Sequence, residues 1–164
     1  MSRLDINIAR LEAQRACLNL AAEEIRGLPG PVLELGLGNG RSYDHLRELM
    51  PMREIFVFER DVAAHPDCIP DENHLFRGDF RDTLAGAGER FGGRVALVHA
   101  DIGSANLDRE GHLPAFIAGY LPGLLRPGGV VASDREIDFK GARHLALPEG
   151  LVPEVYHLLR RPLA

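Results

Sequence analysis

The stretch from Pro31 to Leu46, PVLELGLGNGRSYDHL, constrains this chain more than any other, because it predicts a strand, a glycine loop and a helix in direct succession. An apolar run leads into Gly36, Gly38 and Gly40, and an amphipathic run follows them. Glycine adopts positive φ and lets a ligand approach the backbone closely. The free N–H groups and the dipole of the following helix favour a negative charge at the same place. The stretch therefore predicts a ligand with an anionic group, a phosphate or a carboxylate.

The spacing of these glycines does not match the dinucleotide pattern G-x-G-x-x-G, because Arg41 or Tyr43 stands where the third glycine is needed. The chain instead reads E-x-G-x-G-x-G from Glu34 to Gly40, with the acid at the end of the expected strand. This pattern resembles the first motif of class I S-adenosylmethionine-dependent methyltransferases. A tight strand-to-helix turn that binds no ligand is the alternative, and one glycine pattern does not separate the two interpretations.

The composition is that of an ordinary globular protein: 45% of the 164 residues are apolar and 26% are charged. This length suits one domain, with residues 1–28 as an N-terminal helix and residues 31–164 as its core. No apolar run is long enough to span a bilayer, and the N-terminus lacks the apolar segment of a signal peptide. Cys17 and Cys68 have the spacing of neither a disulfide framework nor a zinc site. We therefore expect a cytoplasmic protein.

Four further β-rich runs follow the glycine loop, and helical segments separate them. The runs are residues 54–59, 74–80, 94–101 and 130–134. Their nearly continuous apolar character is typical of buried parallel strands. The alternation predicts an α/β fold with a Rossmann-like doubly wound sheet, mostly parallel. Two short strands joined by a Pro/Gly-rich turn are expected in the last 30 residues, and the resemblance implies that the last strand is antiparallel.

Acidic residues close several of these runs, and the resemblance implies a role for each. Glu59 ends a strand about 20 residues beyond the glycine loop, where Rossmann-like folds place a ribose-binding carboxylate. A surface acid is the alternative for Glu59. Asp79 is expected to accept a hydrogen bond from the adenine amine, with Phe80 against the ring. Capping of the following helix by Asp79 is an equally weighted alternative, since a cap and a ligand contact use the same lone pairs.

A Pro-Gly-Gly turn precedes the run 130–134 and resembles a hallmark of the same family. In the segment 125–129, LRPGG, the proline cannot continue a helix, and the glycines permit a left-handed reversal. We expect a helix that ends at this turn and a strand that then ends at Asp134.

These landmarks occur in order along the chain, and the resemblance implies S-adenosyl-L-methionine as the cofactor. It implies cofactor contacts at these residues: Glu34, Gly36, Gly38, Asn39, Gly40, Ser42, Glu59, Asp79, Phe80 and Asp101. A sulfonium methyl group is already activated, so the protein mainly has to align it with a nucleophile. If the acceptor must lose a proton, Asp101 and then His99 are the candidate catalytic residues. A core histidine with a hydrogen-bonding partner is the alternative interpretation of His99.

No metal is expected at this site. Asp101 and Asp134, at neighbouring strand ends, would suit Mg²⁺ as in catechol-type O-methyltransferases. That family pattern has an Asp-Asn pair where this chain has Asp134-Arg135. Solvated acids at strand ends are also common.

The acceptor is expected to be a small molecule, because no large insertion is available to grip a macromolecule. No N-P-P-Y, D-P-P-Y or Pro-Cys motif follows the fourth strand, which weighs against methylation of bases or glutamine. The net charge of −5 gives no general attraction to nucleic acid or to an anionic membrane, so neither is an expected partner. Two other functions stay open: a non-catalytic S-adenosylmethionine-binding module and, less favoured, a nicotinamide-dependent oxidoreductase.

One helical stripe near the N-terminus consists of Leu4, Ile8, Leu11, Leu18 and Ile25. An apolar stripe of this kind must be buried against something. We expect this helix to pack beside the cofactor cleft or against a second subunit of a homo-oligomer, and to shape the acceptor pocket. A purely structural cover of the sheet is the alternative.

Overall fold

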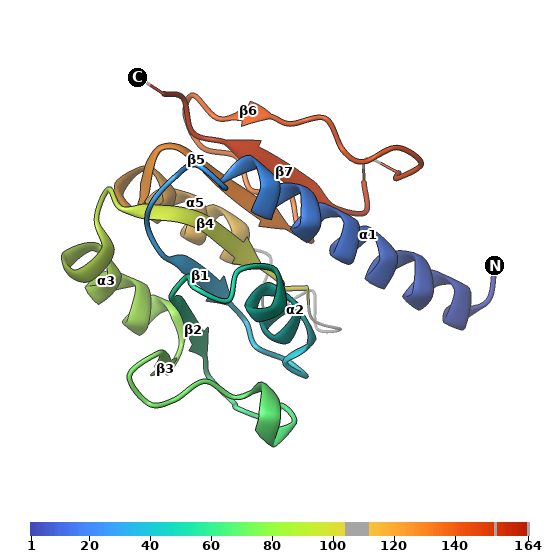
Figure 1. The fold of residues 1–164 in the computed structure, drawn as a ribbon, viewed down its shortest axis with the longest axis horizontal. Coiled ribbons are helices and arrows are strands. Elements are labelled where there is room, and N and C mark those ends of the chain that lie inside the picture. The colour runs from blue at the N-terminus through green and yellow to red at the C-terminus, as the bar shows by residue number, and fades with distance from the viewer. Residues whose placement is uncertain (104–111, 153, 164) are drawn as a thin grey trace.

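The computed structural model describes residues 1–103, 112–152 and 154–163. Within them, seven strands form one sheet in the order β3-β2-β1-β4-β5-β7-β6 (Figure 1). The strands are β1 (Val32–Leu35), β2 (Ile55–Glu59), β3 (Leu75–Arg77), β4 (Val95–Ala100), β5 (Leu125–Ser133), β6 (Arg143–His144) and β7 (His157–Arg160). Neighbours are parallel from β3 to β5, whereas β7 runs antiparallel to both β5 and β6. The predicted mostly parallel sheet with an antiparallel last strand is confirmed.

Helices cover both faces of this sheet. They are α1 (Arg3–Glu24), α2 (Arg41–Leu49), the short 3-10 helix η1 (Pro66–Cys68), α3 (Phe80–Phe91) and α5 (Leu113–Leu124). Alternate side chains of a strand face opposite sides. Val32 of β1 accordingly packs in the layer with α1 and α2, whereas Leu33 packs in the layer with α3 and α5. The central strands β1 and β4 are therefore buried on both faces, and a ligand has to approach at their ends.

The strand order reverses between β1 and β4, which are parallel neighbours at the centre of the sheet. The chain leaves β1 toward β2 and leaves β4 toward β5, so the loops after the two strands diverge. Ligands of open α/β sheets bind in the crevice at such a point, outside the carboxyl ends of the strands. The glycine loop follows β1 directly and therefore lies at this crevice.

Helix α1 departs from the burial that its sequence predicts. Leu18 and Ile25 are 1% and 0% exposed, but Leu4, Ile8 and Leu11 are 67%, 45% and 37% exposed. Figure 1 shows the reason, because the N-terminal half of α1 extends past the edge of the sheet and of α2. Within a single chain the first half of the stripe is therefore exposed, and its burial against a second subunit stays a prediction. A capping box between Ser2 and Asp5 nevertheless closes its N-terminus.

The Pro-Gly-Gly segment lies where its prediction places it, between a helix and a strand. Helix α5 continues through Pro122, ends at Leu124, and passes directly into β5, which contains the turn. Of the two glycines, Gly128 alone has positive φ, at +79°. The register between β4 and β5 shifts across this segment, so the turn is also an irregularity at the start of the strand. The prediction that the helix ends at this segment is confirmed, and β5 ends at Ser133, one residue before the expected Asp134.

Candidate functional site

The three glycines of the loop after β1 serve different purposes. A Cβ at Gly36 would lie 2.6 Å from the carbonyl oxygen of Asp101, so Gly36 lets the ends of β1 and β4 come together. Gly40 is the N-cap of α2 with φ +82°, and a Cβ there would collide with the Cβ of Cys68. A Cβ at Gly38 would meet no atom within 4 Å. Gly38 is therefore the glycine of the three that borders open space, where a ligand can approach the backbone.

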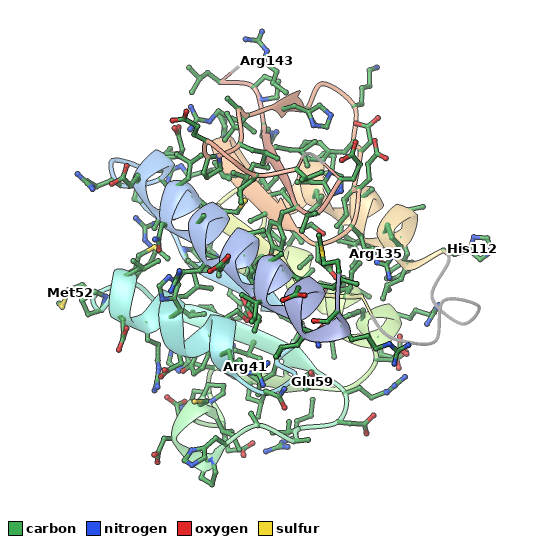
Figure 2. The ribbon with its side chains drawn as sticks, turned by 90° about the vertical axis from the view of Figure 1, so that its right-hand side faces the viewer. Arg41, Met52, Glu59, His112, Arg135 and Arg143 are labelled. Carbon is green, nitrogen blue, oxygen red and sulfur yellow. The ribbon has the colours of Figure 1, made fainter. Side chains whose placement is uncertain are left out.

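Glu59 stands at the end of β2 beside the same loop and is labelled in Figure 2. Its Oε2 accepts hydrogen bonds from the N–H groups of Leu37 at 2.7 Å and Gly38 at 3.2 Å. Its Oε1 accepts from the N–H of Asp61 at 3.0 Å. The sequence predicts that an external anion binds the N–H groups of this loop. In the structure, two of these groups donate to the carboxylate of Glu59 instead. Glu59 is still half-exposed, and its ribose role stays a prediction.

A set of polar side chains that we call the core network lies beneath the loop: Ser42, Glu34, His99 and Tyr156. Glu34 and His99 face each other across β1 and β4, and both are 0% exposed. Nδ1 of His99 lies 2.6 Å from Oε2 of Glu34, and Nε2 contacts the Tyr156 hydroxyl. The Ser42 hydroxyl donates to Oε1 of Glu34. This geometry matches the interpretation of His99 as a core histidine, since both of its ring nitrogens are engaged inside the protein.

A second set, the rim cluster, lies where β4 and β5 end: Arg10, Gln14, Asp101 and Asp134. Arg10 donates to Oδ1 of Asp101 at 2.6 Å, and Gln14 donates to Oδ2 at 3.0 Å. Asp134 accepts from two backbone N–H groups of the loop after β4, at 3.0 and 2.9 Å. The side chain of Asp101 is 26% exposed, so water reaches this cluster. Two polar contacts therefore hold α1 over the sheet edge, next to Gly36.

The electrostatics of the rim cluster argue for an ion pair. Burial and the charge of Asp101 raise the pKa of Asp134, while its N–H partners and Arg10 act in the opposite direction. The Arg10 guanidinium is 3.7 Å from Oδ2 of Asp134 as well as 2.6 Å from Asp101, so it already supplies a positive charge to both acids. Among the described residues, no group of three or more His, Cys, Asp or Glu side chains is placed to hold a metal ion.

The predicted adenine contacts lie at the start of α3. Asp79 is the N-cap of this helix, and its side chain accepts from the N–H of Arg81 at 2.9 Å. That hydrogen bond is the main cause that lowers the pKa of Asp79. Phe80 is half-buried and packs against the core beneath α3 and α5. The capping role of Asp79 is thus established, and the adenine contacts of both residues stay predictions. Asn39 of the loop is exposed.

Three members of the two polar clusters do not stand out in the sequence: Arg10, Gln14 and Tyr156. Gln14 has a signal, because it is a polar residue at helical spacing between Leu11 and Leu18. It is only 7% exposed. Arg10 and Tyr156 have no such signal, since each meets its partner only after distant segments come together.

A doubly wound sheet of this order, with a glycine loop at its switch point and acids at several strand ends, defines the class of Rossmann-like S-adenosylmethionine-dependent methyltransferases. The chain belongs to the S-adenosyl-L-methionine methyltransferase family, whose model matches residues 1–161. It is therefore a methyltransferase, and its cofactor is S-adenosyl-L-methionine. The predicted family, enzyme class and cofactor are confirmed, and the nicotinamide alternative is excluded.

Solved structures agree with this assignment. The chain is 46% identical to an S-adenosyl-L-methionine methyl transferase from Silicibacter pomeroyi DSS-3, covering 98% of this chain and 99% of that chain with a TM-score of 0.92. Human methyltransferase-like protein 13, in complex with SAH, shares the fold at 17% identity, over 93% of this chain and 82% of that chain, with a TM-score of 0.59. The O-methyltransferase TomG from Streptomyces achromogenes, in complex with SAM, shares it at 15% identity, over 95% and 90%, with a TM-score of 0.58.

A search of curated proteins finds no match to this sequence. None of the helices in the described ranges combines the length and the apolar character that a membrane crossing requires.

Proposed function

We propose that this methyltransferase acts on a small molecule whose reactive atom is held beside Asp101. The observation that carries the proposal is the attachment of α1 to the carboxyl edge of the sheet through Arg10 and Gln14. Asp101 is a partly exposed acid under α1 and beside the glycine loop, because its backbone packs on Gly36. An acceptor that reaches Asp101 has to fit under α1, which favours a compact molecule over a folded macromolecule.

A groove of about 310 Å³ between α1 and α2 supports a small acceptor. Its walls include Ile8 and Leu11 of α1, and Ser42 lies at its α2 side. Gln14, which binds Asp101, also lines it, so the groove leads toward the rim cluster. Ligand pockets usually measure about 300–1,000 Å³, and this groove is at the small end of that range. A larger hollow of about 790 Å³ lies at the amino ends of β1 and β2, on the wrong edge for this chemistry.

The chemistry proposed for this site is direct transfer. The lone pair of the acceptor forms a bond to the methyl carbon while the carbon–sulfur bond breaks, and its electron pair stays on the sulfur of S-adenosylhomocysteine. Alignment of the two reactants accounts for most of the acceleration that a site of this kind can give. Where the acceptor atom carries a proton, Asp101 is placed to accept it. His99 has both nitrogens engaged in the core network, so we assign it no direct proton transfer.

The proposed cofactor contacts are the loop from Gly36 to Gly40, Glu59 and the start of α3. Glu34 and Ser42 are 0% and 6% exposed and are hydrogen-bonded to each other, so we assign them the support of this loop from beneath. Gly38 borders the open approach path, and Glu59 is the half-exposed acid beside it. Replacement of Gly38 by valine should abolish binding of S-adenosylhomocysteine, because a branched side chain would occupy that path. Thermal melts with and without S-adenosylhomocysteine measure this. A valine variant that still gains stability on adding the ligand would show that the loop is not the site.

The acceptor class is tested with methyl-labelled S-adenosyl-L-methionine. The protein is incubated with separate small-molecule, protein and RNA fractions, and the label is followed in each. We expect label in the small-molecule fraction and loss of that transfer in Asp101→Asn. Label confined to protein or RNA would overturn the proposed acceptor class.

The groove is tested with Leu11→Trp, which fills it from α1. We expect loss of turnover with little change in affinity for S-adenosylhomocysteine. Leu49→Trp is the matched control, because Leu11 and Leu49 are both 37% exposed and Leu49 lies outside the groove. Full turnover in Leu11→Trp would show that the acceptor does not use this groove.

A further inference from the structure

The core network connects β1, β4, α2 and the segment before β7 through side chains that water does not reach. Glu34 and His99 are 0% exposed, Tyr156 is 1% exposed and Ser42 is 6% exposed. All of them lie on the sheet face that α1 and α2 cover, since Glu34 pairs with His99 in the β1–β4 register. Buried polar groups are expensive unless all of them are satisfied. A four-member network at this place therefore needs a reason beyond packing.

The reason lies in the position of the network, because two of its members flank the glycine loop. Glu34 is in β1, Ser42 is in the first turn of α2, and residues 36–40 with their three glycines lie between them. One carboxylate oxygen of Glu34 binds Ser42 and the other binds His99. The Glu34–Ser42 hydrogen bond thus ties the two ends of the glycine loop together, and His99 holds the carboxylate that accepts this bond.

The charges around His99 favour its protonated form. Burial lowers its pKa, but the charge and hydrogen bond of Glu34 outweigh this and raise it, and Asp101 and Asp134 add to the effect. Burial raises the pKa of Tyr156 well above its usual range, so its hydroxyl stays neutral. The groups that face His99 are therefore one neutral hydroxyl from the segment before β7, the Glu34 carboxylate from β1, and two more distant acids at the ends of β4 and β5.

We propose that His99 is a positioning residue that fixes the cofactor loop by holding Glu34, which in turn holds Ser42. His99 does not touch the cofactor in this arrangement. It sets the distance between the two ends of the loop, and so sets the direction in which Gly38 and its neighbours face the ligand. The inference rests on the proposed role of this loop as the cofactor site.

The first test compares His99→Gln with Val98→Ala by calorimetry with S-adenosylhomocysteine. Both positions are fully buried in β4, but Val98 packs in the layer of α3 and α5 and has no link to the loop. At a temperature where circular dichroism shows both variants folded, we expect His99→Gln to bind about tenfold more weakly than the intact protein. Val98→Ala should lose stability with unchanged affinity. Equal affinities in the intact protein and a folded His99→Gln would overturn the proposal.

A second variant keeps the proposal testable if His99→Gln does not fold. Ser42→Ala leaves the buried Glu34–His99 pair in place and removes the bond that closes the loop. We expect the same loss of affinity, and an unchanged affinity would overturn the proposal. Gly38→Val tests the cofactor site separately from the positioning role of His99. If it still binds S-adenosylhomocysteine, the loop is not the cofactor site; if it does not bind while His99→Gln and Ser42→Ala bind normally, only the positioning role fails.

Nitrogen NMR of the His99 ring supplies a signature that a purely structural role would not require. Because Nδ1 faces a carboxylate and Nε2 faces a hydroxyl, we expect both nitrogens to carry protons at neutral pH. Glu34→Gln should convert the ring to its neutral form and weaken S-adenosylhomocysteine binding together with it. A neutral ring in the intact protein, or a charged ring and full affinity in Glu34→Gln, would contradict the proposal.

Discussion

The core network and the rim cluster each take a residue from the end of β4, but water reaches only the rim cluster. His99 and Asp101 are two residues apart along the chain, where β4 ends, a separation of about 7 Å in a strand. His99 is fully buried, whereas the Asp101 side chain is 26% exposed and meets Arg10 from α1. A step of two residues therefore separates a group that organises the fold from one that can meet a substrate. The residue type at a strand end does not decide its role; its depth does.

The largest expected effect is a difference in unfolding free energy between a variant of the core network and a variant of the rim cluster. Glu34→Ala leaves His99 without its partner in the core, and removing one member of a buried pair costs about 3–5 kcal/mol. Asp101→Ala removes an acid that is partly exposed, and such a pair contributes about 1 kcal/mol or less. Urea unfolding of both variants measures the difference. Similar losses of unfolding free energy would mean that burial does not distinguish the clusters.

The next effect concerns cofactor binding at Glu59, beside the glycine loop. Glu59→Ala should weaken binding of S-adenosylhomocysteine by about 1–3 kcal/mol, because it leaves polar partners in the loop and the ligand unsatisfied. Asp61→Ala is the control, since this exposed acid lies two residues further on and pairs with Arg60. Calorimetry on folded variants gives both affinities. If Glu59→Ala binds as tightly as the control, the ribose assignment of Glu59 has to be abandoned.

A smaller effect should appear in the pH dependence of stability. The pKa of His99 in the folded protein is raised above its ordinary value of 6.5 by the Glu34 carboxylate. Its contribution to stability is therefore fully present below about pH 6.5 and is lost as the pH rises through the folded pKa. Urea midpoints measured from about pH 6 upward should fall more steeply in the intact protein than in His99→Gln. Identical slopes would show that the imidazole does not gain its proton in the fold.

The smallest effect is expected at the exposed end of α1. Leu4 is 67% exposed, so Leu4→Ser should change the unfolding free energy by less than about 0.5 kcal/mol. Leu18→Ser, on the same predicted stripe but 1% exposed, is the contrasting variant and should destabilise strongly. Thermal melts compare them. A large loss in Leu4→Ser would mean that this half of α1 is covered in solution, as its periodicity predicts.

Much of this fold can be predicted because its signals are local. Apolar runs that end in acids locate β2 and β4, and Pro51 locates the end of α2. The spacing of the glycines after β1 distinguishes S-adenosyl-L-methionine from a dinucleotide as the cofactor, since the third glycine of the dinucleotide pattern is missing. The adenine contact of Asp79 cannot be separated from its role as a helix cap, because both use the same oxygens.

The exposure of α1 and the partners of Asp101 and His99 could not be predicted, because they depend on contacts between distant segments. The exposed half of α1 has the same periodicity as the buried half, and only the width of the sheet distinguishes them. The link of Gln14 to Asp101 joins residues that are 87 positions apart, and that of His99 to Tyr156 joins residues 57 apart. The sequence leaves His99 as either a base or a core histidine, and the choice depends on Tyr156, which no motif identifies.

The position of β7 has a consequence for biosynthesis. It lies between β5 and β6 although it is the last of the described strands along the chain, and Tyr156 immediately precedes it. The nascent chain therefore carries its glycine loop early but lacks the hydroxyl that completes the core network until residue 156 emerges. Arg160 of β7 also pairs with Glu24 at the end of α1, so this contact of α1 forms only after β7 has been synthesised. We expect that chains terminated before residue 156 leave Nε2 of His99 without its hydroxyl partner and are cleaved by proteases more readily than the intact chain.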